Sequence, residues 1–383
     1  MDFELTEIQR DIGNAAREFA EKEFAEVARE YDEKEEFPRD LWRKACELGF
    51  VGTFIDEQYG GAGLGFTEAA MVMEEFWRVD PGCGNILLAA FGAEVIQEFG
   101  TDEQKKRYLP VIPGGKAIMG SAITEPDAGS DILLAATSAA RDGDGYVLSG
   151  SKIFITNGSV ADFLIVFCVT DPSPANRYKR HSFFIVETDR PGFEARKMKG
   201  KMGIRASDTA ELSFNNVRVP AESLVGDVPN DGFRQVMHLF NINRLIAGVQ
   251  GIGAAQGAFD KAVRHVQQRK QFGKALATFQ GIQFMIADMA TKIEVARNML
   301  YKACWLIDHG KFDARQIAMA KLFAGQVAVS VTNDALQLHG GYGYLAEYGV
   351  EKFFRDAKIV EIYEGAREIE KITIAREILG RGA

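Results

Sequence analysis

The sequence contains few of the residues that mark secreted or metal-binding proteins. Its 383 residues include four cysteines and five histidines. The cysteines, Cys46, Cys83, Cys168 and Cys304, are widely spaced and form no CxxC pair. The histidines are scattered, so we expect no metal site. Reduced, mostly buried thiols are typical of the bacterial cytoplasm, which we predict, with the mitochondrial matrix as the alternative compartment.

Long apolar runs and an excess of positive charge are also missing. No apolar run reaches the roughly 18 residues that would suggest a membrane-spanning helix. Residues 1–12, "MDFELTEIQRDI", are acidic and amphipathic, unlike a signal peptide. The formal charge is 45 − 54 = −9, which argues against a broad surface for nucleic acid or anionic lipid. We therefore expect an intracellular protein that binds neither nucleic acid nor membrane.

Three segments of different character follow one another along the chain. Residues 1–115 and 226–383 repeat apolar residues every three or four positions, which predicts helices. Residues 116–225 contain β-branched and aromatic runs separated by turn clusters such as "RDGDG". We predict an α+β fold: an N-terminal all-α domain, a middle antiparallel β-barrel-like domain and a C-terminal four-helix-bundle-like domain. Within the first domain, residues 85–100 are predicted to form one buried helix.

Two stretches carry residues suited to a polar ligand. "AITEPDAGSD", residues 122–131, contains a turn that exposes backbone N–H groups and hydroxyls, although a plain turn is an equal alternative. "QLHGGYGYLAEYGVEKFFRD", residues 337–356, has two glycines where a backbone can approach a flat or anionic group, or simply turn between helices. The GxG pairs lack the βα context of a Rossmann fingerprint.

Together the two stretches resemble the signatures of the acyl-CoA dehydrogenase family. "KIFITNG" (152–158), "KMGIRASDT" (201–209), "RKQFGK" (269–274) and "RDAKIVEIYEG" (355–365) follow in the family's order. The resemblance therefore covers essentially the whole chain. It implies noncovalently bound FAD, a homotetramer, and oxidation of an acyl-CoA thioester to its trans-2-enoyl form. It also implies electron-transferring flavoprotein as the partner that takes the electrons.

Glu364 matches the catalytic base of that family. The α-proton of a thioester is too weakly acidic for a free carboxylate, so a site must stabilise the enolate and hold a base beside the α-carbon. Burial by substrate and flavin would raise the pKa of the Glu364 carboxyl toward neutral pH. Some relatives place the base on another helix, at the position of Ile242, which cannot take a proton. Without the resemblance, Glu364 would be interpreted as a solvated acid at a helix start.

The resemblance also implies which residues hold the cofactor. Contacts around the flavin ring and its phosphates fall on Ile123, Thr124, Ser130, Phe154 and Thr156. The ADP half, partly across a subunit boundary, falls on Arg269, Phe272, Gln280, Gln337, Gly340 and Gly341. A stacking aromatic ring suits the flavin, and the cation of Arg269 suits the pyrophosphate.

For the acyl-CoA substrate, the matching residues are Ser130, Asn241, Arg244, Gly365 and Arg376. The charge of Arg244 lies in an apolar helix start and needs a partner, and a structural ion pair is the alternative for Arg376. Leu87, Phe91 and Ile362 are apolar candidates for the acyl pocket, with core packing as the alternative. They favour short to medium, branched or alicyclic acyl groups. Residues 85–99 contain no arginine to receive a second carboxylate.

The chain departs from the family pattern after Glu364. Ala366 and Arg367 stand where hydroxyl residues are usual, and Asn241 stands where an acid is more common. Arg367 could meet a phosphate or face solvent. Two alternatives remain at this point, a flavin-dependent oxidase and a non-enzymatic DNA-associated flavoprotein. The length and Glu364 argue against the oxidase, and the charge of −9 argues against the DNA-associated protein.

Overall fold

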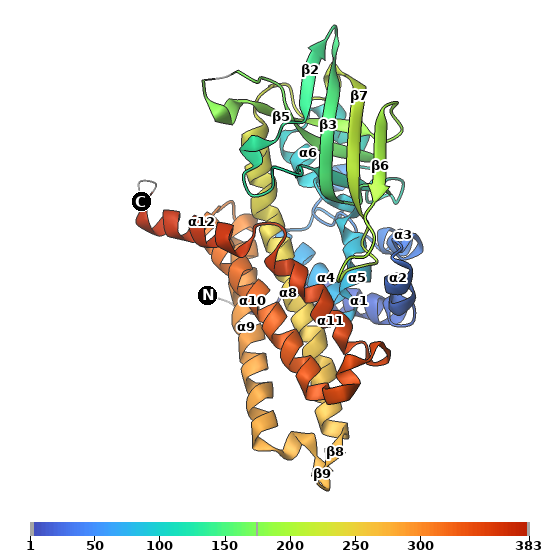
Figure 1. The fold of residues 1–383 in the computed structure, drawn as a ribbon, viewed down its shortest axis with the longest axis vertical. Helices are drawn as coiled ribbons and strands as arrows, with labels where there is room; N and C mark the ends of the chain where they lie inside the picture. The colour runs from blue at the N-terminus through green and yellow to red at the C-terminus, as the bar shows by residue number, and fades with distance from the viewer. Residues whose placement is uncertain (1–3, 174, 381–383) are drawn as a thin grey trace.

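The computed structural model describes residues 4–173 and 175–380 (Figure 1). The first part of the chain is helical. Its elements are α1 (Glu7–Phe24), α2 (Ala28–Lys34), α3 (Arg39–Glu47), η1 (Glu57–Tyr59), α4 (Phe66–Val79), α5 (Pro81–Gly84), η2 (Asn85–Ala90), α6 (Ala93–Phe99) and α7 (Asp102–Tyr108). Helix α1 begins at a capping box between Thr6 and Gln9, as its sequence predicts. Its apolar stripe is buried, and Phe19 stacks on Phe76 of α4 with 5.3 Å between ring centroids.

The helix predicted over residues 85–100 is wrong as a single element. The 3-10 helix η2 ends at Ala90, and α6 starts only at Ala93. Between them Gly92 adopts φ 106°, a left-handed conformation that glycine tolerates best. A Cβ on Gly92 would lie 2.3 Å from Ser121 Oγ, so the β sheet packs too closely against Gly92 to leave room for a side chain.

The middle of the chain forms one curled sheet, which lies at one end of the long axis (Figure 1). Its strands are β1 (Met119–Ala122), β2 (Ser138–Asp142), β3 (Gly145–Thr156), β4 (Phe163–Val169), β5 (His181–Glu187), β6 (Phe193–Lys197) and β7 (Thr209–Pro220). The order is β1-β4-β2-β3-β7-β6, with β5 also on β4. Short 3-10 turns accompany it, namely η3 (Ile132–Leu134), η4 (Arg177–Lys179) and η5 (Ala221–Ser223).

Two strand pairings correct the expectation of an antiparallel domain. Strand β1 pairs with β4 in parallel, and β2 meets β4 in parallel at Ser138 and Val169. The remaining pairings of this sheet, β2–β3, β3–β7, β4–β5 and β6–β7, are antiparallel. Parallel neighbours need a long connection, and the whole β2–β3 hairpin lies between β1 and β4 in the chain. The turns that separate the strands in sequence therefore do not reveal this pairing.

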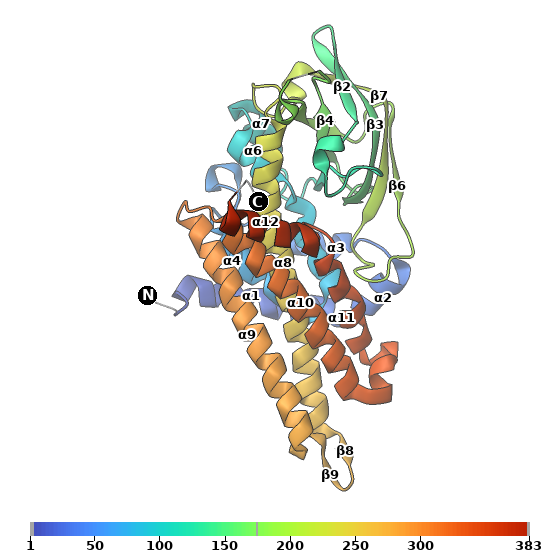
Figure 2. The same ribbon diagram turned by 60° about the vertical axis from the view of Figure 1, so that its left-hand side comes forward.

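The last part of the chain is a bundle of long helices. It contains α8 (Gly232–Gln268), α9 (Gln280–Asp308), α10 (Ala314–His339), α11 (Val350–Ala357) and α12 (Arg367–Leu379). The strands β8 (Lys270–Gln271) and β9 (Lys274–Ala275) form a hairpin after α8, and η6 (Leu276–Thr278), η7 (Gly340–Tyr344), η8 (Ala346–Tyr348) and η9 (Lys358–Glu361) complete the connections. Helix α8 runs from the sheet to the opposite end of the molecule (Figures 1 and 2). Helical N- and C-terminal parts around a curled sheet confirm the predicted fold class.

A buried ion network joins the three parts of the chain. Lys352 of α11 lies 2.8 Å from Asp80, which caps α5, and 2.6 Å from Asp356. The second oxygen of Asp356 accepts the Ile204 N–H at 2.6 Å, which fixes the segment before β7. All four cysteines are buried, as predicted. In the described part of the chain, no helix is both long and apolar enough to cross a membrane.

Candidate active site

Glu364 lies on the short segment between η9 and α12. Helix α12 begins at Arg367 with Ala366 as its N-cap, so Glu364 precedes the helix. Its backbone adopts φ 50° and the next residue, Gly365, adopts φ 99°. A left-handed conformation is uncommon for a residue with a side chain and must be held by its surroundings. Glu364 is also partly buried, which an ordinary solvated acid at a helix start is not.

Burial sets the proton affinity of this carboxyl. It raises the pKa of Glu364 to about 7, against the opposing influence of the Lys321 and Arg244 cations and of the Asn243 side chain. At neutral pH a large fraction of the side chain is ionised and can accept a proton. A base is most effective when its pKa lies near the working pH. The site therefore has a group suited to proton abstraction.

An apolar cavity of about 50 Å³ opens close to Glu364. Leu87 and Phe91, the candidates for the acyl pocket, both line it, together with Ile242 and Asn243. Ile362 does not; its side chain is 56% exposed. The remaining lining residues are Phe50, Gly52, Thr53, Phe54, Phe66, Ala69, Met73, Leu88, Ala90, Glu94 and Ile246. The cavity is small and largely apolar, so it suits a short acyl chain.

Glu94 is a residue that the sequence reasoning missed. It lines the apolar cavity from the first turn of α6 and is only 6% exposed. Burial raises the pKa of Glu94 to about 7, and the nearby charge of Glu364 raises this pKa further. The hydrogen bond that the Glu94 carboxylate accepts from the Gly92 N–H at 3.0 Å has the opposite effect and lowers the pKa. The signal was present, because "FGAEVI" places an acid inside an otherwise apolar run.

Three of the predicted substrate residues come together around a second missed acid, Glu370. The Arg244 guanidinium donates from Nε to Glu370 Oε1 at 2.8 Å and from Nη1 to Asn241 Oδ1 at 2.9 Å. Gly365 packs directly on Glu370, where a Cβ would lie 1.9 Å from Oε1. Arg244 thus has its partner within the chain. Ser130 and Arg376 are exposed and lie outside this cluster.

Of the residues predicted around the flavin ring, Ile123 and Thr124 directly follow β1, Phe154 and Thr156 end β3, and Ser130 is exposed in the bend after Thr124. Ile153 N–H donates to Thr124 O at 2.9 Å, and the buried Lys152 ammonium donates to Ile123 O at 2.9 Å. These bonds hold the 122–131 stretch against β3. A register irregularity between Lys152 and Ile155 leaves Phe154 at φ 60° with its ring 63% exposed. An open aromatic face of this kind is suited to stacking.

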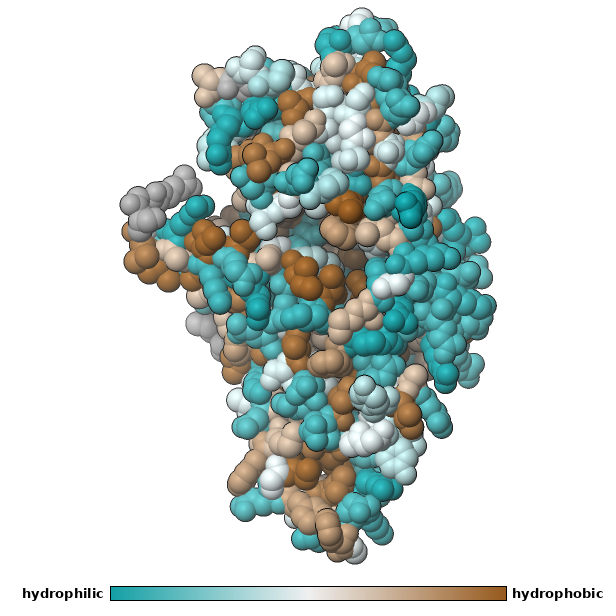
Figure 3. Space-filling model, in the orientation of Figure 1, coloured by the Kyte–Doolittle hydropathy of each residue, from teal (hydrophilic) through white to brown (hydrophobic). Residues whose placement is uncertain are grey.

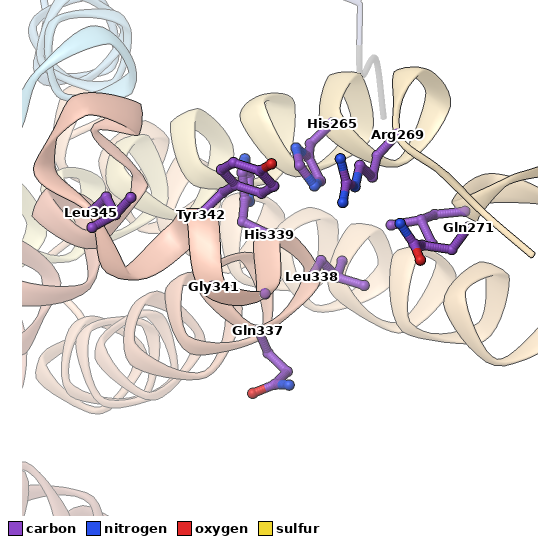
Figure 4. A pocket seen from close by; sticks show the side chains of 11 residues that line it. His265, Arg269, Gln271, Gln337, Leu338, His339, Gly341, Tyr342 and Leu345 are labelled. Atoms are coloured by element: carbon purple, nitrogen blue, oxygen red, sulfur yellow. The ribbon is translucent and has the colours of Figure 1, made fainter.

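Most residues predicted for the ADP half gather around a second pocket, of about 400 Å³. Arg269 follows α8, and Gln337, Gly340 and Gly341 come from the end of α10 and the start of η7. Figure 4 shows Arg269 directed toward Tyr342, with its guanidinium 5.0 Å from the ring centroid, whereas the Gln337 side chain points away from them. His265, Gln271, Leu276, Leu338, His339, Tyr342 and Leu345 complete the lining.

Phe272 and Gln280 lie near this second pocket rather than in it. Phe272 occupies the two-residue turn of the β8–β9 hairpin, at φ 52° and 92% exposed, and Gln280 begins α9. The hairpin and the sheet stand at opposite ends of the long axis (Figure 1). One chain therefore presents two separate sets of predicted cofactor residues.

Two of the three departures from the family pattern, Ala366 and Arg367, lie at the start of α12. Arg367 Nη1 lies 3.3 Å from Glu361 Oε1, so its cation is engaged by a carboxylate of η9. Ala366, which has no side-chain hydroxyl, leaves α12 without a side-chain cap. Neither residue displaces Glu364.

Sequence-family models match three consecutive parts of the chain. The acyl-CoA dehydrogenase N-terminal domain matches residues 6–116, the middle domain residues 120–217 and the C-terminal domain residues 230–379. The chain belongs to the acyl-CoA dehydrogenase family. Among its relatives is an acryloyl-CoA reductase (NADH) of Anaerotignum propionicum, which is 44% identical over 100% of this chain and 97% of the relative.

Solved structures of similar proteins extend this assignment. Butyryl-CoA dehydrogenase from Megasphaera elsdenii is 39% identical with a TM-score of 0.95, covering 99% of this chain and 100% of the other. A chain from work on the electron transferring flavoprotein of Acidaminococcus fermentans is 43% identical with a TM-score of 0.96 and the same coverage. The FAD complex of PigA is 32% identical with a TM-score of 0.94, and the match covers 100% of both chains.

This member of the acyl-CoA dehydrogenase family is thus an FAD-dependent oxidoreductase of CoA thioesters. Its own residues fit the cofactor: an exposed aromatic ring near backbone and hydroxyl groups at β1 and β3, and a cation and two glycines that line the second pocket. Glycines at 340 and 341 leave open space, because a Cβ at either would meet nothing within 4 Å.

Proposed function

We propose that this protein catalyses α,β-dehydrogenation of a short acyl-CoA thioester, with Glu364 as the base that removes the α-proton. The observation that carries the proposal is the Glu364 carboxyl, held at φ 50° beside an apolar cavity with a pKa of about 7. Ile242, at the alternative base position, lines the same cavity without a titratable group. When bound, FAD supplies the hydride acceptor at flavin N5.

The residues of the chain bind the acyl group, stabilise the developing negative charge and accept the proton. The apolar cavity holds the acyl chain and excludes water, which preserves the basicity of Glu364. In this proposal the backbone N–H of Glu364 donates to the thioester oxygen as negative charge develops there. The proton ends on the Glu364 carboxylate.

The size and charge of the cavity favour a short, uncharged acyl group. Its volume is about 50 Å³, and Phe50, Phe54 and Phe91 occupy much of the wall. Glu94 would repel a second carboxylate on the substrate whenever it is ionised. The butyryl-CoA dehydrogenase relative supports a four-carbon chain, and branched or alicyclic groups of similar size are the alternatives.

Electron-transferring flavoprotein is the proposed acceptor of the electrons. The similarity to the chain from the Acidaminococcus fermentans work supports this assignment. The acryloyl-CoA reductase relative supports operation of the same site in the direction of enoyl-CoA reduction. We place the protein in the bacterial cytoplasm as a homotetramer.

The test is an anaerobic titration of the FAD-loaded protein with butyryl-, octanoyl-, isobutyryl-, cyclohexanecarboxyl- and glutaryl-CoA. We expect butyryl-CoA or another short thioester to bleach the flavin band, and glutaryl-CoA to leave it unchanged. Glu364→Gln should retain yellow FAD and lose flavin reduction by at least ~1000-fold, because the residue that takes the proton is gone.

Glu368→Gln is the matched control, because Glu368 is an exposed acid on α12 only four residues away. It should reduce at the unchanged rate. Unimpaired reduction in Glu364→Gln would remove Glu364 from its assigned role, and a yellow protein that no thioester bleaches would reject the substrate class.

A further inference from the structure

Lys321 is a buried cation in the middle of α10. Its side chain is 1% exposed, and its helix neighbours Ala318, Ala320 and Ala324 are buried. A buried ammonium is costly unless its protons are bound. The Lys321 Nζ donates to Tyr363 O at 2.9 Å and to Gly365 O. The ammonium is therefore bound to main-chain carbonyls and not to a carboxylate.

These two carbonyls belong to the residues on either side of Glu364. Lys321 thus fixes the peptide group that precedes Glu364 and the one that follows Gly365. A third hydrogen bond holds the same segment, because the Tyr363 hydroxyl donates to Gln250 Oε1 on α8. Glu364 needs such support, since its φ of 50° is a conformation that a residue with a Cβ rarely adopts.

Charges from several elements surround this contact. Lys321 faces Glu364 and three further charged groups, Glu370 of α12, Arg244 of α8 and Glu361 of η9. Glu364 in turn faces Lys321, Arg244, the Asn243 amide and Glu94 of α6. Burial lowers the pKa of Lys321 to about 8, so the group remains largely protonated at neutral pH. Its positive charge opposes the effect of burial on the Glu364 carboxyl.

We propose that Lys321 is a positioning residue for the reaction. It fixes the backbone of Glu364 through the two flanking carbonyls, and it places a positive charge that keeps the neighbouring carboxylate available as a base at neutral pH. This inference rests on the proposed function, in which Glu364 takes the α-proton. No catalytic contact of Lys321 with substrate is part of it.

The test compares Lys321→Met, which loses both donor and charge, with Lys321→Gln, which keeps a donor and loses the charge. Lys292→Met is the matched control, because Lys292 bonds to Ser330 of α10 from α9 and does not contact the Glu364 segment. Each FAD-loaded variant is followed between pH 5.5 and 9 in two ways. One is the rate of flavin reduction by the best thioester. The other is infrared titration of the carboxyl band that Glu364→Gln removes.

In Lys321→Met we expect the midpoint of the carboxyl titration and of the rate profile to rise by about 1 pH unit, since an opposite charge at close range shifts a carboxyl by this order. The rate at pH 7 should fall at least ~5-fold and recover in part at pH 9. Lys321→Gln should show the same midpoint shift with a higher limiting rate. Lys292→Met should match the unmodified protein.

An unchanged titration midpoint in both Lys321 variants would overturn the inference. So would a loss of rate that is equal at every pH and accompanied by a lower unfolding temperature, because a merely structural lysine would act in that way. The infrared titration requires no turnover. A failure of the proposed function, seen as full activity in Glu364→Gln, is therefore distinguishable from a failure of the role of Lys321.

Discussion

At the scale of single residues, the site combines acids that have unlike partners. Glu370 is neutralised by Arg244 at 2.8 Å, whereas Glu94 accepts a backbone N–H and faces an apolar cavity. Glu364 is intermediate between an ion-paired acid and an acid without a cation. Two cations lie near it, but it forms no ion pair shorter than 4 Å among the described residues. Such partial compensation leaves a carboxyl that exchanges a proton near neutral pH.

The raised pKa of Glu364 predicts a pH-dependent effect on stability. The carboxyl titrates at about 7 in the folded protein and near 4.5 when unfolded. The folded state therefore binds more protons between these values, and its stability falls as the pH rises through this window. Glu364→Gln removes this contribution. By calorimetry of the FAD-loaded proteins, the variant should gain more in unfolding temperature over the unmodified protein at pH 8 than at pH 5. An equal gain at both pH values would contradict the raised pKa.

Single residues also show which features of the site could be predicted from the sequence alone. The Thr6 capping box and the position of Glu364 ahead of α12 follow from local patterns and from the family resemblance. Lys321 does not, because a lysine in a helical pattern gives no sign that its partners are carbonyls 42 and 44 residues away. The sequence predicts that the charge of Arg244 needs a partner. That this partner is Glu370 depends on how α8 and α12 pack and could not be predicted.

At the scale of elements, the helix starts are stabilised by long-range contacts as well as by local ones. Helix α10 is capped locally, since Asp313 accepts Gln316 N–H at 3.0 Å. The start of α4 instead uses Asp308 at the end of α9, which accepts the Phe66 N–H at 2.7 Å and the Thr67 N–H at 3.0 Å. This contact ties the first helical part of the chain to the last.

We expect Asp308→Ala to reduce the free energy of unfolding by about 1–2 kcal/mol, the usual cost of losing a cap. Hydrogen exchange of residues 66–69 should accelerate, because the first turn of α4 loses its acceptor. Urea denaturation and exchange measured by mass spectrometry test both statements. Asp313→Ala is the control: it should cost a similar free energy and leave exchange at 66–69 unchanged. Unaltered exchange at these residues in Asp308→Ala would show that the contact does not hold α4.

Elements that depend on contacts between parts of the chain could not be predicted. The apolar run over 85–100 is compatible with one helix, and only the approach of Ser121 shows why it breaks at Gly92. The parallel pairing of β1 with β4 likewise depends on which strands meet, which turn chemistry between consecutive strands does not specify. Helices with a periodic pattern of their own, such as α1 and α10, lie inside the two segments that the sequence predicts to be helical.

At the scale of the whole molecule, apolar side chains remain exposed at the end that carries the β8–β9 hairpin (Figure 3). Phe272, Phe284, Tyr344 and Leu345 are each more than half exposed. A contiguous exposed apolar surface marks an interaction site, and the proposed homotetramer would cover it. The same end carries the second pocket with Arg269 and Gly340.

Phe272→Ser should therefore weaken the assembly. We expect light scattering to show a lower average mass at equal concentration, because the variant loses an exposed aromatic anchor. Val228→Ser is the control, an exposed apolar residue that precedes α8 at its opposite end. It should leave the mass unchanged. An unaltered mass in Phe272→Ser would place the interface elsewhere.

The length of α8 has a thermodynamic consequence for the cofactor. Its 37 residues, about 55 Å long at 1.5 Å per residue, run from the sheet that carries the predicted flavin-ring residues to the opposite end of the molecule, where the predicted ADP residues surround Arg269 (Figure 1). One dinucleotide does not span that distance, so each FAD would be shared by two chains of the proposed assembly. Binding and association are then linked by mass action: dilution releases FAD, added FAD restores the assembly, and the apparent affinity for the cofactor increases with the concentration of the protein itself.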